Sequence, residues 1–151
     1  MTAKLLLLFL PIGVSAGELP YFNVLARDAG SWPQIFASIG FQQHADAHVF
    51  VARSGSAATS DWPGRLEKGA FLVLEGESPL AESLGFKRGK GTVHTTSLQD
   101  VHRPTLPIIW EKALELPVMD LPTGATVFAR ERWTGAAMTA GVRRGAGAVL
   151  W

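Results

Sequence analysis

The chain has 151 residues, a formal net charge of +1 and no cysteine, and 47% of its residues are hydrophobic. This length suits one domain with its own core, and the balanced charge argues against a nucleic-acid partner, because such partners select basic surfaces. The absence of cysteine excludes thiolate metal sites, thiol nucleophiles and disulfides.

The first sixteen residues have the pattern of a secretory signal peptide. Lys4 supplies a positive charge, residues 5–10 are apolar, and residues 14–16 (VSA) form a small-residue cleavage pattern. The apolar run is too short to span a bilayer. The sequence therefore predicts a secreted or periplasmic protein with a signal peptide over residues 1–16, a single domain over residues 17–151, and no membrane partner after cleavage.

The mature part begins with alternating strand and helix patterns. Ser31, with Gln34 three residues later, matches a capping box at the start of the first helix. Both early helices have a Trp-Pro pair in their first turn, where proline costs no hydrogen bond. In chain order, the predicted elements are a strand over residues 21–27, a helix over 31–39, a strand over 48–53 and a helix over 61–67.

Residues 69–86, GAFLVLEGESPLAESLGF, predict a buried strand that turns sharply into a short helix. The apolar run over residues 70–74 is typical of a strand that is buried on both faces. Ser78 is expected to cap the helix, and Gly85 to end it. The turn between strand and helix carries Glu75, Glu77 and Ser78.

After residue 86 the pattern changes to short strand candidates separated by glycine and proline. Residues 137–151 predict a closing hairpin that turns near Gly145. Because the sequence stops inside an apolar strand, we expect an N-terminal fragment of a longer protein, with Trp151 near an unpaired sheet edge. The other strand candidates are residues 92–96, 106–110, 118–120 and 126–130.

Together these patterns predict an α/β fold, with an open, mostly parallel, doubly wound sheet of the flavodoxin type and a β-rich C-terminal part that ends in a hairpin. In the commoner strand order 2-1-3, the first and third strands are neighbours. Their carboxyl ends would then bring Asp28 toward Glu75 and Glu77, and we expect a ligand-binding crevice there that also includes Ser78.

Carboxylates that converge in a crevice can bind a divalent cation or sugar hydroxyls, or share a proton for acid–base catalysis. The alternative is that they are solvated side chains near a helix N-terminus, stabilised by the helix dipole. Ser78 partly matches a nucleophile elbow, but Pro79 lacks the N–H that would donate to an oxyanion. We therefore expect no catalytic residue, no metal ligand and no cofactor.

Three tryptophans late in the chain offer aromatic faces on which sugars can stack. They are Trp110, Trp133 and Trp151, and their spacing does not bring them together by itself.

The stretch FLVLEGESPLAESLGF, the scattered strands and the closing VRRGAGAVLW hairpin resemble the glutamine-amidotransferase-like (class I) fold. The likeness is to its non-amidotransferase branches, which include the trehalose-utilisation type and the trimerisation domains of some β-galactosidases. True amidotransferases have a cysteine at the elbow, and this chain has Ser78 at that position. They also have a late His-x-Glu motif, and neither His94 nor His102 is followed by a glutamate two residues later. The resemblance therefore implies the fold and argues against the activity.

We expect an exported, non-catalytic binding or accessory domain that is related to carbohydrate, and the carbohydrate part rests on the resemblance. The expected partners are a carbohydrate ligand and a downstream domain or oligomer partner. Two alternatives remain open. One is a carboxylate-dependent hydrolase that uses Asp28, Glu75 and Glu77, and the other is a subunit-interface domain without a small ligand.

Overall fold

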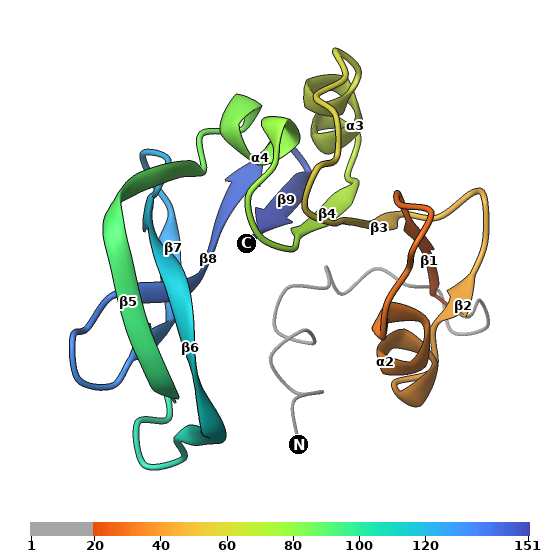
Figure 1. The fold of residues 1–151 in the computed structure, drawn as a ribbon. Coiled ribbons are helices and arrows are strands. Elements are labelled where there is room, and N and C mark those ends of the chain that lie inside the picture. The colour runs from red at the N-terminus through yellow and green to blue at the C-terminus, as the bar shows by residue number, and fades with distance from the viewer. Residues whose placement is uncertain (1–19) are drawn as a thin grey trace.

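The structure, a computed structural model that describes residues 20–151, is built on one nine-stranded mixed sheet in the order β2-β1-β3-β4-β9-β8-β7-β5-β6 (Figure 1). From β2 to β9 in this order the neighbouring strands are parallel, and from β9 to β6 they are antiparallel. The strands are β1 (Tyr21–Val24), β2 (Gln42–Gln43), β3 (Val49–Ala52), β4 (Phe71–Leu74), β5 (Lys87–Asp100), β6 (Ile108–Asp120), β7 (Thr126–Glu131), β8 (Ala137–Arg144) and β9 (Gly147–Leu150).

Three short helices follow the first strands, each with a proline in its first turn. They are α2 (Trp32–Ser38), α3 (Trp62–Glu67) and α4 (Pro79–Ser83). Ser78 caps α4 as predicted, because its side chain accepts a hydrogen bond from the Ala81 N–H at 3.0 Å. The prediction of a capping box at Ser31 is wrong. The Ser31 backbone is helical rather than extended, and the Ser31 side chain makes no hydrogen bond that caps α2.

The parallel half of the sheet is covered by helices on both faces. Alternate residues of a strand point to opposite faces, so β3 and β4 contribute to two separate clusters. Val51 and Val73 pack with Phe36 of α2 on one face. Ala52 and Leu72 pack on the other face with side chains of α3 and α4. Because helices cover both faces of the sheet here, β3 and β4 are unbroken runs of apolar residues.

The antiparallel half is dominated by β5 and β6, which pair along much of their length (Figure 1). The predicted short strands over residues 92–96, 106–110 and 118–120 therefore overlap these two long strands. Gly89 and Gly91 lie where the β5–β6 register shifts between Arg88 and Thr92. Pro117 is accommodated within β6 because β6 is the terminal strand of the sheet.

The predicted α/β class, with its mostly parallel flavodoxin-type sheet, is wrong, because half of the nine-stranded sheet is antiparallel and the helices are short. The strand order is also wrong: β3 lies between β1 and β4, the first and third predicted strands. The closing hairpin is present as β8 and β9, but its last strand is not an edge, since β9 pairs with both β4 and β8.

The predicted signal peptide over residues 1–16 lies outside the described residues. Among the helices of the described part, none has the length and apolar character needed to cross a membrane.

Candidate functional site

An ion pair forms where two neighbouring parallel strands end. Ala52 of β3 lies opposite Leu74 of β4, so the next residues, Arg53 and Glu75, leave the sheet side by side. Arg53 Nε donates to Glu75 Oε2 at 2.9 Å, and a second guanidinium nitrogen lies 3.3 Å from Glu75 Oε1. Two contacts between planar groups fix the orientation of both side chains.

The same guanidinium reaches the loop after β1. Arg53 NH1 lies 3.0 Å from Asp28 Oδ2 and donates to the Asp28 carbonyl oxygen at 2.7 Å. The other carboxylate oxygen of Asp28 accepts a hydrogen bond from the Gly30 N–H at 2.9 Å. Gly30 has a φ of +57°, a conformation that favours glycine. Arg53 thus joins Asp28 to Glu75, although their strands are not neighbours.

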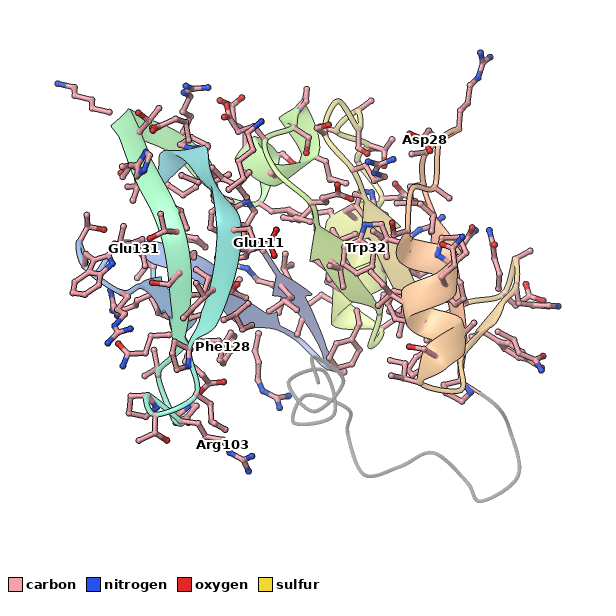
Figure 2. All side chains as sticks on the ribbon, turned by 60° about the horizontal axis from the view of Figure 1, so that its bottom comes forward. Asp28, Trp32, Arg103, Glu111, Phe128 and Glu131 are labelled. Atoms are coloured by element: carbon pink, nitrogen blue, oxygen red, sulfur yellow. The ribbon has the colours of Figure 1, made fainter. Side chains whose placement is uncertain are left out.

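Trp32, the first residue of α2, completes the arrangement by donating from its indole Nε1 to Glu75 Oε2. Figure 2 shows Trp32 beside the sheet and Asp28 in the loop before α2. The side chains surround a pocket of ≈ 290 Å³. Its lining residues are Gly30, Ser31, Trp32, Ile35, Arg53 and Glu75.

Both carboxylates of this site are held in the ionised form. The hydrogen bond from the Gly30 backbone, and then the Arg53 guanidinium, lower the pKa of Asp28. Burial raises the pKa of Glu75, but the hydrogen bonds from Arg53 and Trp32 outweigh burial and leave that pKa below its usual value. The hydrogen bonds that Arg53 donates to Glu75 and Asp28 raise the pKa of Arg53. The site therefore carries two negative charges and one positive charge at neutral pH.

The other two predicted site residues have partners of their own. Glu77 forms an ion pair with Arg88 of β5, with 2.8 Å between Oε1 and NH1. Ser78 is buried, and its hydroxyl oxygen serves the helix cap. Neither residue lines the pocket. Ligand contact by Glu77 or Ser78 stays a prediction.

Two members of the site, Arg53 and Trp32, are absent from the sequence-based set. Arg53 has a usable signal, since it follows a buried strand directly, as Glu75 does. The helical spacing of Trp32 indicates a ring that packs on the core and gives no sign of a partner for its indole N–H. Within residues 20–151, no three histidine or carboxylate side chains gather in a way that could hold a metal ion.

No protein-family model and no curated protein matches the chain. Solved structures do match the chain. An exo-β-1,4-mannosidase from Opitutaceae bacterium strain TAV5 matches with a TM-score of 0.56 and 13% identity, over 88% of this chain and 30% of that one. A catalytic mutant of a GH42 β-galactosidase from G. stearothermophilus matches with a TM-score of 0.51 and 12% identity, over 88% of this chain and 27% of that one.

At this level of identity the likeness concerns the fold alone. The chain shares its fold with part of two glycoside hydrolases and spans less than a third of either. The expected resemblance to β-galactosidase domains is consistent with this result, whereas nothing found here identifies the amidotransferase-like superfamily.

Proposed function

We propose that this chain is a non-catalytic accessory module of a larger, exported, carbohydrate-active protein. The observation that carries the proposal is the coverage of the structural likeness: 88% of this chain corresponds to no more than 30% of either glycosidase chain. A fold that accounts for so small a share of a glycosidase is one module of it. Transfer of the carbohydrate-related role is an argument by analogy of fold.

The charges of the candidate site support a binding role over catalysis. A carboxyl group that acts as a general acid at neutral pH needs a raised pKa. The pKa values of Asp28 and Glu75 are lowered instead, and both carboxylates are hydrogen-bonded to Arg53. This arrangement suits fixed acceptors for ligand hydroxyl groups more than it suits proton transfer.

The proposed ligand contacts are Asp28, Glu75, Arg53 and Trp32. Carboxylate oxygens accept from sugar hydroxyls, and the guanidinium donates to them. The Trp32 ring adds an apolar wall, and the hydrogen bond from its Nε1 keeps the Glu75 carboxylate oriented. The polar groups of this open pocket are held in place by one another, so they keep their positions when a ligand binds.

Titration calorimetry with β-1,4-linked manno- and galacto-oligosaccharides tests this role. We expect the wild-type chain to bind at least one of them, and Arg53→Gln and Glu75→Gln to weaken that binding by about tenfold, the effect of losing one charged hydrogen bond. Arg65→Gln is the matched control, because Arg65 pairs with Asp61 on α3 and does not line the pocket.

Two results would contradict the proposal. Absence of binding to every oligosaccharide and polysaccharide tested would remove the carbohydrate role. Hydrolysis of aryl glycosides that disappears in Glu75→Gln would instead establish the alternative, a carboxylate-dependent hydrolase.

A subunit-interface role is the second candidate, and exposed apolar side chains near the connection between β5 and β6 favour it. Ile109, at 67% exposed, and Leu106, at 61%, are the largest contributors, with Val101 and Ile108 close to them in sequence. Equilibrium sedimentation tests self-association through this region. A dimer or trimer that Ile109→Glu dissociates would support the role, and a monomer at every concentration would contradict it.

A further inference from the structure

The turn between β7 and β8 presents an exposed aromatic side chain, well away from the pocket. Trp133 is 74% exposed, more than any other large hydrophobic side chain in residues 20–151. The guanidinium carbon of Arg132 lies 4.9 Å from the centroid of the Trp133 ring. Figure 2 shows Glu131, at the start of this turn, by the antiparallel strands and apart from Trp32.

Glu131 holds the backbone of this turn from inside. Its side chain is 1% exposed, and Oε2 accepts hydrogen bonds from the Trp133 N–H at 2.8 Å, the Thr134 N–H at 2.6 Å and the Thr134 hydroxyl at 2.9 Å. The Gly135 N–H donates to the Glu131 carbonyl at 3.0 Å, and Arg130 donates to the Gly135 carbonyl at 2.8 Å. The backbone of the turn is therefore held on both sides of Trp133.

The Glu131 carboxylate is buried and ionised. Burial of a carboxylate is costly unless its oxygens are well satisfied. Here Oε2 has three donors, whereas Oε1 is buried with no hydrogen-bond partner in the structure. Burial raises the pKa of Glu131, but the hydrogen bonds from Thr134 and Trp133 outweigh burial and lower it. A charged anchor thus holds the backbone of the turn that carries the exposed Trp133.

An exposed indole face matches one surface of a sugar. The C–H groups of a pyranose face carry partial positive charge and pack on the negative face of an aromatic ring. The Arg132 guanidinium lies over one face of the Trp133 indole, which leaves the other face for a ligand. Because the turn is fixed before binding, little conformational entropy is lost when a ligand stacks.

The surroundings of Trp133 favour a sugar over a protein partner. The residues that flank Trp133 in the turn, Arg132 and Thr134, are both polar, and the exposed Ile108 of β6 lies on the far side of β5, since Leu98 pairs with both Glu131 and Ile108. A protein interface of ordinary size needs an extended, desolvated core around such a residue.

We propose that Trp133, with Arg132 over one face of its indole, forms a sugar-binding platform on which a pyranose ring stacks against the other face. This inference rests on the proposed carbohydrate-related function and adds a second contact point, distinct from the Trp32 pocket, for a polysaccharide chain.

The test compares Trp133→Ala, Trp133→Phe and wild type in calorimetry with the same β-1,4-linked oligosaccharides. We expect Trp133→Ala to bind about tenfold more weakly and Trp133→Phe to retain most of the affinity, since stacking requires an aromatic face. Leu106→Ala, another exposed apolar residue, is the control and should leave the affinity unchanged. Melting curves establish that each variant is folded.

The two proposals fail in distinguishable ways. If wild type binds a sugar and Trp133→Ala binds it equally well, the platform is refuted and the accessory function stands. If wild type binds no sugar, both are refuted. Should Trp133→Ala fail to fold, the indole N–H resonance of Trp133 in the wild-type chain decides: a shift during sugar titration supports the platform, and an unchanged resonance refutes it.

Discussion

Arg53 and Glu75 form an ion pair with 2.9 Å between Nε and Oε2, although 22 positions separate them in the sequence. The pair exists because β3 and β4 are parallel and in register up to Ala52 and Leu74. With the contact of Arg53 to Asp28, it connects the loops after three strands of the parallel half.

Arg53→Ala should lower the free energy of unfolding by about 1 kcal/mol. The Arg53 and Glu75 side chains are 24% and 42% exposed, so solvent screens part of the attraction and the loss falls below that of a fully buried pair. Urea denaturation measures the change. Arg88→Ala, which breaks the more exposed pair with Glu77, should cost about 0.5 kcal/mol or less. Equal losses for both variants would contradict a special role for Arg53.

Ser78→Ala should destabilise the chain by about 0.5–2 kcal/mol, because it removes the only side-chain acceptor for the Ala81 N–H at the start of α4 among the described residues. Ser31→Ala is the matched control: Ser31 stands at the same position of α2 but makes no side-chain cap bond, so its removal should change stability little. Thermal melting of the two variants checks the difference. Covalent labelling of Ser78 by a serine-directed probe would show that its role goes beyond capping.

Gly147→Ala should destabilise the chain by about 1–3 kcal/mol or prevent folding, because an added Cβ would lie 2.1 Å from the carbonyl oxygen of Ala70 and 2.6 Å from that of Leu66. Relief would require β9 to move away from β4. Gly64→Ala is the control, since its Cβ would meet no atom within 4 Å, and alanine in place of glycine within α3 should be neutral or stabilising. Chemical denaturation of both variants tests whether β9 is packed as tightly as this contact implies.

Glu131 should make stability depend on pH. The pKa of Glu131 in the folded chain lies below the ordinary value of 4.5. The stabilisation that the ionised Glu131 gives to the folded chain is therefore present in full above about pH 4.5, and it is lost as the pH falls through the lowered folded-state pKa. Glu131→Gln should therefore be less stable than wild type at pH 7, with a difference that narrows in acid. Denaturation at several pH values measures the difference in stability, and Glu111→Gln, at an exposed position of β6, is the control for the loss of a carboxylate. A constant difference for Glu131→Gln would contradict the role of its charge.

We further propose that the chain is exported and cleaved after Ala16. Intact-mass measurement of protein from the native cell envelope or medium should then give a chain that begins at Gly17. Protein that retains Met1 or Thr2 would show that the signal-peptide pattern is not used.

What the sequence by itself determined was local. The apolar run that becomes β4, the Ser78 cap of α4 and the closing hairpin are each specified by residues within one turn or one strand pair of each other. Propensity, capping and turn chemistry act over this range, so a linear pattern is enough to predict them. The position of Glu75 at the end of a buried strand belongs to the same class.

The tertiary structure alone decided which strands are neighbours. Phe71 pairs with Ala148, and β9 thereby joins the parallel half to the antiparallel half, a choice that no local pattern encodes. The long β5 and β6 strands are hidden in sequence because glycines, a proline and register shifts interrupt their alternation. For the same reason the charge that joins Asp28 to Glu75 is Arg53, at the end of the strand between them. Long-range pairing is selected by the packing of the whole sheet, which is why the site was only partly visible in the sequence.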